Sequence, residues 1–223
     1  MAREIKKKVK NAVLYADGTI RLSGVRFSYP HLAKPYKGDG DKGEAKYGIT
    51  LMLPKSTHKA ARDLINERID ELLKENKVKA LASDKKFLRD GDESGKEEYA
   101  DHWTVSARET RRPPLRDRQN NVVEPEDAND VFQPGYWGDA LIRPWYQNND
   151  YGKRVNAGLS SVQMVKKDET FGEGRISDED LDDTFEDYGD DDVDDEDEDE
   201  RPARKPSSRK RGYDDDDDDD VDI

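Results

Sequence analysis

The sequence predicts a mainly β fold with one inserted helix, a small barrel or sandwich, followed by a disordered acidic C-terminal tail. Three features of the 223 residues support this prediction. Several segments alternate apolar and polar residues, one segment has apolar residues at helical spacing, and the composition changes after Lys167. Alternating strands around a single amphipathic helix are typical of small barrels and sandwiches of the α+β kind.

Two strands are expected in the first quarter of the chain. Over residues 18–29, apolar side chains recur at every second position in two pairs, which are Ile20 with Leu22 and Val25 with Phe27. Gly24 lies between the pairs and suits a bulge or bend. A loop rich in Gly, Asp and Lys over residues 35–45 leads to a second alternating strand over residues 46–53.

One helix is expected after Pro54. Its apolar residues recur at helical spacing over about five turns: Ala61, Leu64, Ile65, Ile69, Leu72 and Leu73. This pattern predicts an amphipathic helix that covers the β-layer with one face. His58 would lie in its first turn, and we expect its side chain to be exposed.

Three further strand regions follow, over residues 102–108, 135–145 and 154–165, where aromatic and apolar residues alternate with polar ones. A charged loop over residues 84–101 precedes them. Five of its residues match positions of a calcium-binding loop: Asp90, Asp92, Ser94, Gly95 and Asp101. Because the last is Asp rather than Glu and no amphipathic helix flanks the loop, we interpret it as a solvated acidic loop.

Charge divides the chain into two parts. Residues 1–167 carry 32 Lys and Arg against 25 Asp and Glu, whereas residues 168–223 carry 7 against 28, which gives net charges of +7 and −21. A basic body with an acidic appendage is typical of a nucleic-acid-binding protein with an acidic tail. We expect a flexible basic N-terminus (1–17), a folded domain (18–174) and a disordered tail (175–223) with a basic island at 201–211.

The composition excludes several classes of function. Because the chain has no cysteine, it forms no disulfide, no thiolate zinc site and no iron–sulfur cluster. Its three histidines are far apart, and no nucleophile motif is present, so we expect neither an enzyme nor a metal or other cofactor. No apolar run suits a signal peptide or a membrane span, which predicts a soluble cytoplasmic protein without a membrane partner.

Aromatic and basic residues interleave in the body. Single-strand-binding proteins combine a positive groove with side chains on which bases stack. We therefore predict DNA binding by Arg26, Tyr29, Lys46, Trp103, Arg108, Arg111, Arg112, Trp137, Arg143, Trp145, Tyr146, Lys153 and Arg154. Alternation places Trp137, Arg143 and Trp145 on one strand face. For any single aromatic residue, a place in the core is an equally good interpretation.

The C-terminus combines acidic and apolar residues. A tethered polyanion competes with DNA for a cationic groove, and an acidic end with apolar residues can also dock on a basic pocket of another protein. We predict partner binding by Asp214, Asp215, Asp216, Asp217, Asp218, Asp219, Asp220, Val221, Asp222 and Ile223.

Several dispersed motifs follow one another along the chain. In order they are GVRFSY (24–29), KYG (46–48), LMLPKS (51–56), LRDGDE (88–93), PLRD (114–117), GY (135–136) and GLSSVQ (158–163). Together they resemble a family of phage single-stranded DNA-binding proteins. The resemblance implies an OB-like barrel over residues 18–174 and sequence-independent binding and protection of single-stranded DNA in phage DNA replication, recombination or repair. We expect replication proteins of the phage or host to bind the acidic C-terminus, in the host bacterial cytoplasm if the chain is phage-encoded. The resemblance also implies the presence of that acidic C-terminus. It assigns no catalytic residue and no role to the basic island.

Two other functions compete with this one. The chain could be an acidic chaperone or DNA mimic that binds basic proteins, with residues 204–211 as a nuclear-import signal. An accessory factor of a nuclease or ligase would need a metal-ligand cluster, which the sequence lacks. Oligonucleotide binding by the body without its tail would distinguish a single-strand-binding protein from an acidic chaperone or DNA mimic. No pattern in the sequence specifies an oligomeric state.

Overall fold

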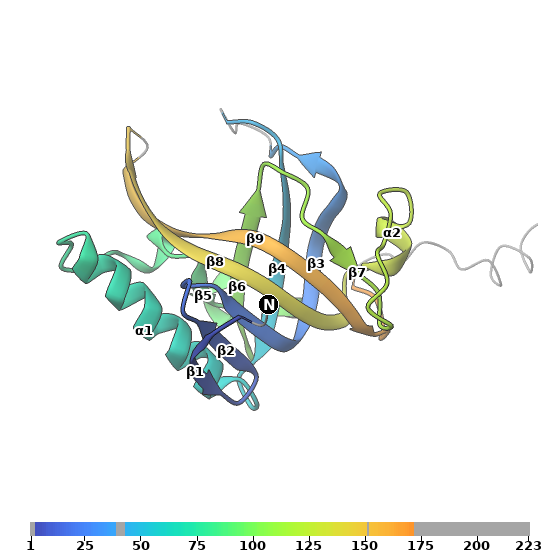
Figure 1. Cartoon of the computed structure of the whole chain (residues 1–223), viewed down its shortest axis with the longest axis horizontal. Helices are drawn as coiled ribbons and strands as arrows, with labels where there is room; N and C mark the ends of the chain where they lie inside the picture. Colours follow the sequence, from blue (N-terminus) through green and yellow to red (C-terminus); the bar gives the residue numbers. More distant parts are fainter. Residues whose placement is uncertain (1–2, 39–42, 151, 172–223) are drawn as a thin grey trace, which may run out of the picture. The chain divides into compact units, whose positions relative to one another are not determined.

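Strands dominate the computed structural model, which describes residues 3–38, 43–150 and 152–171 (Figure 1). The described strands are β1 (Ile5–Val9), β2 (Ala12–Tyr15), β3 (Ile20–Tyr36), β4 (Lys46–Pro54), β5 (Leu88–Asp90), β6 (His102–Glu109), β7 (Leu115–Arg116), β8 (Trp137–Asn149) and β9 (Gly152–Lys166). The described helices are α1 (Lys59–Glu75), the short α2 (Ala128–Val131) and three 3₁₀ turns, η1 (Ser83–Lys85), η2 (Asp92–Ser94) and η3 (Glu97–Tyr99). The prediction of a mainly β barrel with one long inserted helix is confirmed.

Five strands close the barrel in the order β3, β4, β6, β9 and β8, after which β8 pairs again with β3. All neighbours are antiparallel except β6 and β9, which run parallel through the pairs Ala107 with Ala157 and Arg108 with Gly158. Strand β3 pairs with β8 through its first part, from Ile20 to Arg26, and with β4 through its second, from Arg26 to Tyr36. The long strand β3 therefore closes the barrel, because it pairs with both the last and the next strand in this order.

A bend in β3 makes this double pairing possible. The register with β8 shifts between Leu22 and Val25, and Gly24 has a φ of 66°, a left-handed conformation that glycine adopts without the steric cost of a Cβ. The predicted bulge at Gly24 is therefore confirmed. Inside the barrel, the rings of Phe27 and Phe132 lie 6.0 Å apart, and both are buried.

The helix α1 covers one side of the barrel beside β1 and β2 (Figure 1). Its buried residues are the six that the sequence predicts: Ala61, Leu64, Ile65, Ile69, Leu72 and Leu73. The expectation of an exposed His58 was wrong. Its ring is buried, with Nε2 at 2.9 Å from the Ser23 carbonyl oxygen and Nδ1 at 2.8 Å from Thr57 Oγ1. Burial lowers the pKa of His58, so the ring is neutral at pH 7.

The N-terminal segment, expected to be flexible, instead forms the hairpin β1–β2 and extends the sheet at β3. Ala12 and Leu14 are buried in the core. Lys6 forms an ion pair with Glu71 of α1 at 3.3 Å, and Lys7 forms another with Glu67 at 2.5 Å. Lys6 and Lys7 therefore belong to a strand that lies beside acidic residues of α1, and not to a solvated N-terminal arm.

The charged loop before β6 is organised by a lysine. Lys55 Nζ donates to Asp90 Oδ1 at 2.5 Å and to Asp92 Oδ2 at 2.6 Å. The hydrogen bond from Lys55, followed by that from the Asp101 backbone, lowers the pKa of Asp92. Within the described ranges no three His, Asp or Glu side chains gather as a metal site. The Lys55 ammonium group binds two of the carboxylates that the calcium-loop template would use as ligands.

Two other expectations concern a membrane span and the acidic tail. In that part of the chain, no helix is both long enough and apolar enough to cross a membrane. The acidic tail, including its predicted partner-binding residues from Asp214 to Ile223, lies outside the described residues.

Close packing at Gly138 gives a test of the barrel. A Cβ at this position would lie 2.1 Å from the Gln163 carbonyl oxygen and 2.2 Å from Phe27 Cζ, whereas a Cβ at Gly38 would meet nothing within 4 Å. We expect Gly138→Ala to lower the free energy of unfolding by about 1–3 kcal/mol or more. Gly38→Ala, the matched control, leaves it nearly unchanged. Urea unfolding of both variants checks this, and equal stabilities would contradict the packing of β3 against β8 and β9.

Candidate nucleic-acid interface

A row of paired residues crosses the outer surface of the barrel, and we call it the arginine row. Its members, in the order β3, β4, β6, β9 and β8, are His31, Gly48, Arg108, Gly158 and Arg143. Their chain neighbours Ile49, Ala107, Ala157 and Ile142 are buried in the core. Because side chains alternate between the two faces of a strand, the arginine row faces outward. Both of its arginines are exposed.

The two glycines of the arginine row keep its surface low. Neither has a φ in the left-handed region, so the backbone does not require glycine there. A Cβ on Gly48 would lie 3.1 Å from Arg108 Cγ, and one on Gly158 would lie 3.3 Å from Glu109 Oε2. The stem of Arg108 therefore lies close against the β4 backbone, where a side chain on residue 48 would crowd it.

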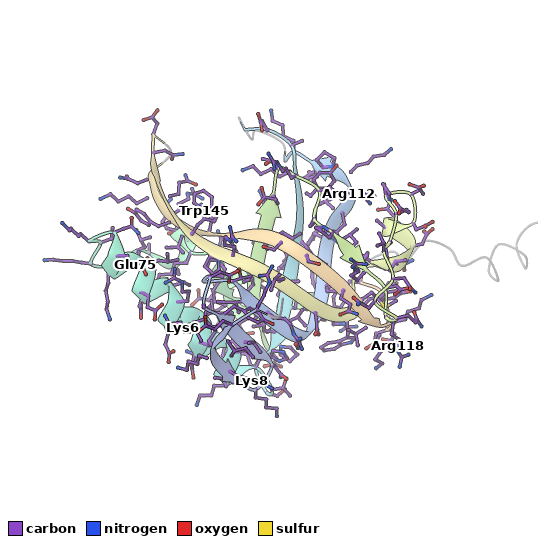
Figure 2. All side chains as sticks on the ribbon, in the orientation of Figure 1. Lys6, Lys8, Glu75, Arg112, Arg118 and Trp145 are labelled. Atoms are coloured by element: carbon purple, nitrogen blue, oxygen red, sulfur yellow. The ribbon has the colours of Figure 1, made fainter. Side chains whose placement is uncertain are left out.

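The β8–β9 hairpin continues this surface at one end of the arginine row. Trp145, which is 44% exposed, pairs with Asn156, and Gln147 pairs with Arg154 on the same outward face as Arg143. Asn156 Nδ2 donates to Gln147 Oε1 at 2.8 Å, and Gln147 Nε2 donates to Asn149 Oδ1 at 2.9 Å. Trp145 lies beside this hairpin where it rises from the barrel (Figure 2). Trp145 is therefore exposed on a strand face that also carries amide and guanidinium side chains.

The β3–β4 hairpin rises from the same end of the barrel (Figure 1). Tyr36, 53% exposed, stacks on the ring of His31 with centroids 4.4 Å apart and an interplanar angle of 13°. Lys46 pairs with Tyr36 across this hairpin. Burial, and then the nearby charge of Arg108, lower the pKa of His31, which is therefore neutral at pH 7.

Exposed aromatic side chains concentrate on this surface. Among the described residues, the aromatic side chains that are largely exposed are Tyr29, Tyr36 and Trp145. All three belong to the barrel strands that carry the arginine row, and Tyr29 lies two residues before His31. Exposed apolar rings beside cations are the features that single-strand recognition requires.

Two of the predicted DNA-binding residues lie in a separate cluster at the start of β8. The Arg26 guanidinium lies over the rings of Trp137 at 5.7 Å and Phe171 at 4.2 Å, and its Nη2 donates to the Glu169 carbonyl oxygen at 3.1 Å. Trp137 Nε1 donates to Asp168 Oδ2 at 2.6 Å. Trp145 lies eight positions after Trp137, or about 26 Å further along an extended strand. This cluster holds the segment that follows β9.

Other predicted residues also lie apart from the arginine row. Trp103 is partly buried beneath Arg62 of α1, with its ring 4.8 Å from the guanidinium. Tyr146 pairs with the buried Val155 and packs against the core, on the opposite face of β8 from Trp145; Lys153 shares that face of the hairpin. Arg111 and Arg112 follow β6 in the connection to β7, where Figure 2 places Arg112.

The structure thus brings Arg108, Arg143, Trp145, Arg154 and Lys46 to one surface, together with Tyr29. The sequence prediction missed four residues of that surface: His31, Tyr36, Gln147 and Asn156. Alternation within β8 would have indicated Gln147, two residues after Trp145. The others join the surface only through strand pairing, which alternation in a single segment does not specify.

Comparison with known proteins places the chain among phage proteins. The sequence pattern described as "Enterobacter phage Enc34, ssDNA-binding protein" matches residues 18–197. The single-stranded DNA-binding protein of bacteriophage Enc34, solved in complex with ssDNA, is 44% identical; the match covers 76% of this chain and 98% of that chain, with a TM-score of 0.73. Another structure of the Enc34 protein is 43% identical over 81% of this chain and 99% of its own, with a TM-score of 0.71.

A further relative is protein p50 of Acyrthosiphon pisum secondary endosymbiont phage 1. It is 29% identical over 175 residues, which are 74% of this chain and 92% of the relative. The family pattern begins at residue 18 and therefore omits the β1–β2 hairpin. The resemblance inferred from dispersed motifs is confirmed, and so is the prediction of a binding protein rather than an enzyme. This chain belongs to the family of phage single-stranded DNA-binding proteins represented by that of Enterobacter phage Enc34.

Proposed function

We propose that this protein binds and protects single-stranded DNA along the arginine row, without sequence preference, during phage DNA replication, recombination or repair. One observation carries the proposal: the exposed aromatic rings of the described residues gather on the surface that presents Arg108 and Arg143. Family membership supports it, because the Enc34 relative was solved with ssDNA.

The groups on this surface suit an unpaired strand. The guanidinium groups of Arg108 and Arg143 attract phosphates and displace counterions, which contributes affinity without sequence information. Trp145 and Tyr36 offer rings to unstacked bases, at opposite ends of the arginine row. A duplex keeps its bases stacked and inaccessible to these rings, so single strands are preferred.

The acidic tail regulates this surface in our proposal. Residues 168–223 carry a net charge of −21 beside a body of +7, so the tail competes with DNA for the cationic surface. The C-terminal residues Asp214 to Ile223 add an acidic and apolar end that replication proteins of the phage or host can bind. Both roles follow from charge and composition.

Replacing Trp145 tests the stacking surface. Trp145→Ala should weaken binding of a single-stranded oligonucleotide by about 1–3 kcal/mol, because one base loses its stacking partner. Trp145→Phe should retain most of the affinity, and fluorescence anisotropy measures both. Equal affinity of the unaltered protein for single strand and duplex at matched salt would overturn the proposal, as would full affinity of a folded Trp145→Ala variant.

Replacing Arg143 tests the phosphate contacts. Arg143→Ala should reduce the slope of log affinity against log salt by about one phosphate contact, since fewer counterions are released. Arg118→Ala is the matched control, because Arg118 is exposed but lies in the loop after β7, away from the arginine row. Affinities over a series of salt concentrations give the slopes. Identical slopes for the two variants would remove Arg143 from the interface.

Deleting residues 213–223 tests the tail. The deletion removes eight aspartates and should raise affinity for single strands mainly at low salt, where charges are least screened. At high salt the full-length and deleted proteins should converge. Replacing the eight aspartates by asparagine, with Val221 and Ile223 kept, should reproduce the effect on DNA. An unchanged affinity at every salt concentration would show that the tail does not compete.

A further inference from the structure

We propose that Tyr29 and Lys96 form a second base-stacking subsite, separated from Trp145 by the width of the barrel surface. The inference rests on the proposed single-strand binding and adds a residue, Lys96, that neither the sequence nor family membership indicates. Tyr29 is 49% exposed, although it lies in the middle of β3, where the neighbouring Phe27 and Ser28 are buried.

Tyr29 is held in an unfavourable backbone conformation. Its φ is 47°, a left-handed value that bulky residues with a Cβ rarely adopt. The register between β3 and β4 shifts between Ser28 and His31, so Tyr29 lies on a bulge. Bulges often redirect a side chain, and residues in such conformations cluster at ligand sites because the surrounding structure must hold them there. Stability alone would favour glycine at this position.

Lys96 fixes the exposed ring from one side. Its Nζ donates to Tyr29 Oη at 2.6 Å and lies 4.1 Å from the ring centroid. The hydrogen bond to Tyr29 raises the pKa of Lys96, so the ammonium group is charged. A cation over one face of an aromatic ring is attracted by the ring quadrupole. With Lys96 holding the ring, its exposed surface remains available to a base.

The loop that carries Lys96 is built rigidly on the barrel. Gly91 N donates to the His102 carbonyl oxygen at 2.8 Å, and a Cβ at Gly91 would lie 2.3 Å from the Tyr99 carbonyl oxygen. Ser94 Oγ donates to the Gly91 carbonyl oxygen and accepts from Lys96 N. The buried Tyr99 hydroxyl lies 3.2 Å from Ser28 Oγ. Lys96 is therefore presented by a fixed loop, beside the residue that precedes Tyr29.

The position of Tyr29 sets the length of strand that reaches it. A path over the barrel surface from Tyr29 on β3 to Trp145 on β8 crosses β4, β6 and β9. Four inter-strand spacings amount to about 19 Å. An oligonucleotide must therefore span several nucleotides to contact both rings, whereas a short one occupies the surface of Arg143 and Trp145 alone. The contribution of Tyr29 is consequently length-dependent.

The experiment compares Tyr29→Gly with the unaltered full-length protein on oligothymidylates of about 4 to 16 nucleotides, the range of single-strand site sizes. We expect the melting temperature to rise, because glycine relieves the strained φ, while affinity for the longest oligonucleotides falls by about 5- to 100-fold. For the shortest oligonucleotides that bind, affinity stays unchanged. Asn120→Gly, at a φ of 66° in the loop after β7, is the control that relieves strain without affecting DNA binding.

Variants of Lys96 test its positioning role. Lys96→Gln should lower affinity only for the long oligonucleotides, and Lys96→Arg, which keeps a cation over the ring, should restore it. Full affinity of Tyr29→Gly for long oligonucleotides, or an equal loss at every length, would overturn the subsite. Those results would leave the effect of Trp145→Ala intact, whereas failure of the unaltered protein to prefer single strands would refute the proposed function itself.

Discussion

The barrel depends on the ability of β3 to pair with two different strands. Its first part donates and accepts backbone hydrogen bonds with β8, and its second part does so with β4. The bulge at Gly24 bends the strand within the part that pairs with β8, shortly before the pairing with β4 begins at Arg26. With the parallel contact between β6 and β9, this pairing closes the five strands into a barrel. Because β3 and β8 both continue beyond the closure, each ends in a hairpin that projects from the same end of the barrel (Figure 1). The candidate interface lies over the strands between these hairpins.

Much of the fold could be predicted from local patterns. The six buried residues of α1 and the outward position of Arg143 and Trp145 follow from periodicity of 3.6 and 2 residues. The N-terminal hairpin could not be predicted in this way, because Lys6 and Lys7 acquire partners only when α1 lies beside them. His58 misled for a similar reason: its carbonyl partner is 35 positions away in the chain. Local composition predicts that such residues are solvated, whereas contacts with residues distant in the chain pair or bury them.

The candidate site was predictable only in part, and the reason is the register of the barrel. Grouping by closeness in sequence joined Arg26 to Tyr29 and Trp137 to Trp145, yet Arg26 and Trp137 meet each other and the segment after β9 instead. The arginine row takes one residue from each of five strands, so its members are far apart in the chain. Its two glycines carry no chemical signal of their own. Their role follows only from the Arg108 side chain beside them.

The three tryptophans occupy three distinct environments, and this gives the protein its own optical reporters. Trp145 is exposed beside the arginine row, Trp137 donates to the Asp168 carboxylate, and Trp103 lies under the Arg62 guanidinium. Indole emission depends on the polarity and the charges around the ring, so each residue responds to a different event. Emission from Trp145 reports on ligands at the barrel surface, that of Trp137 on the attachment of the segment after β9, and that of Trp103 on the docking of α1. Variants that retain one tryptophan at a time can therefore separate DNA contact from changes at the segment after β9 and in the fold, without an added label.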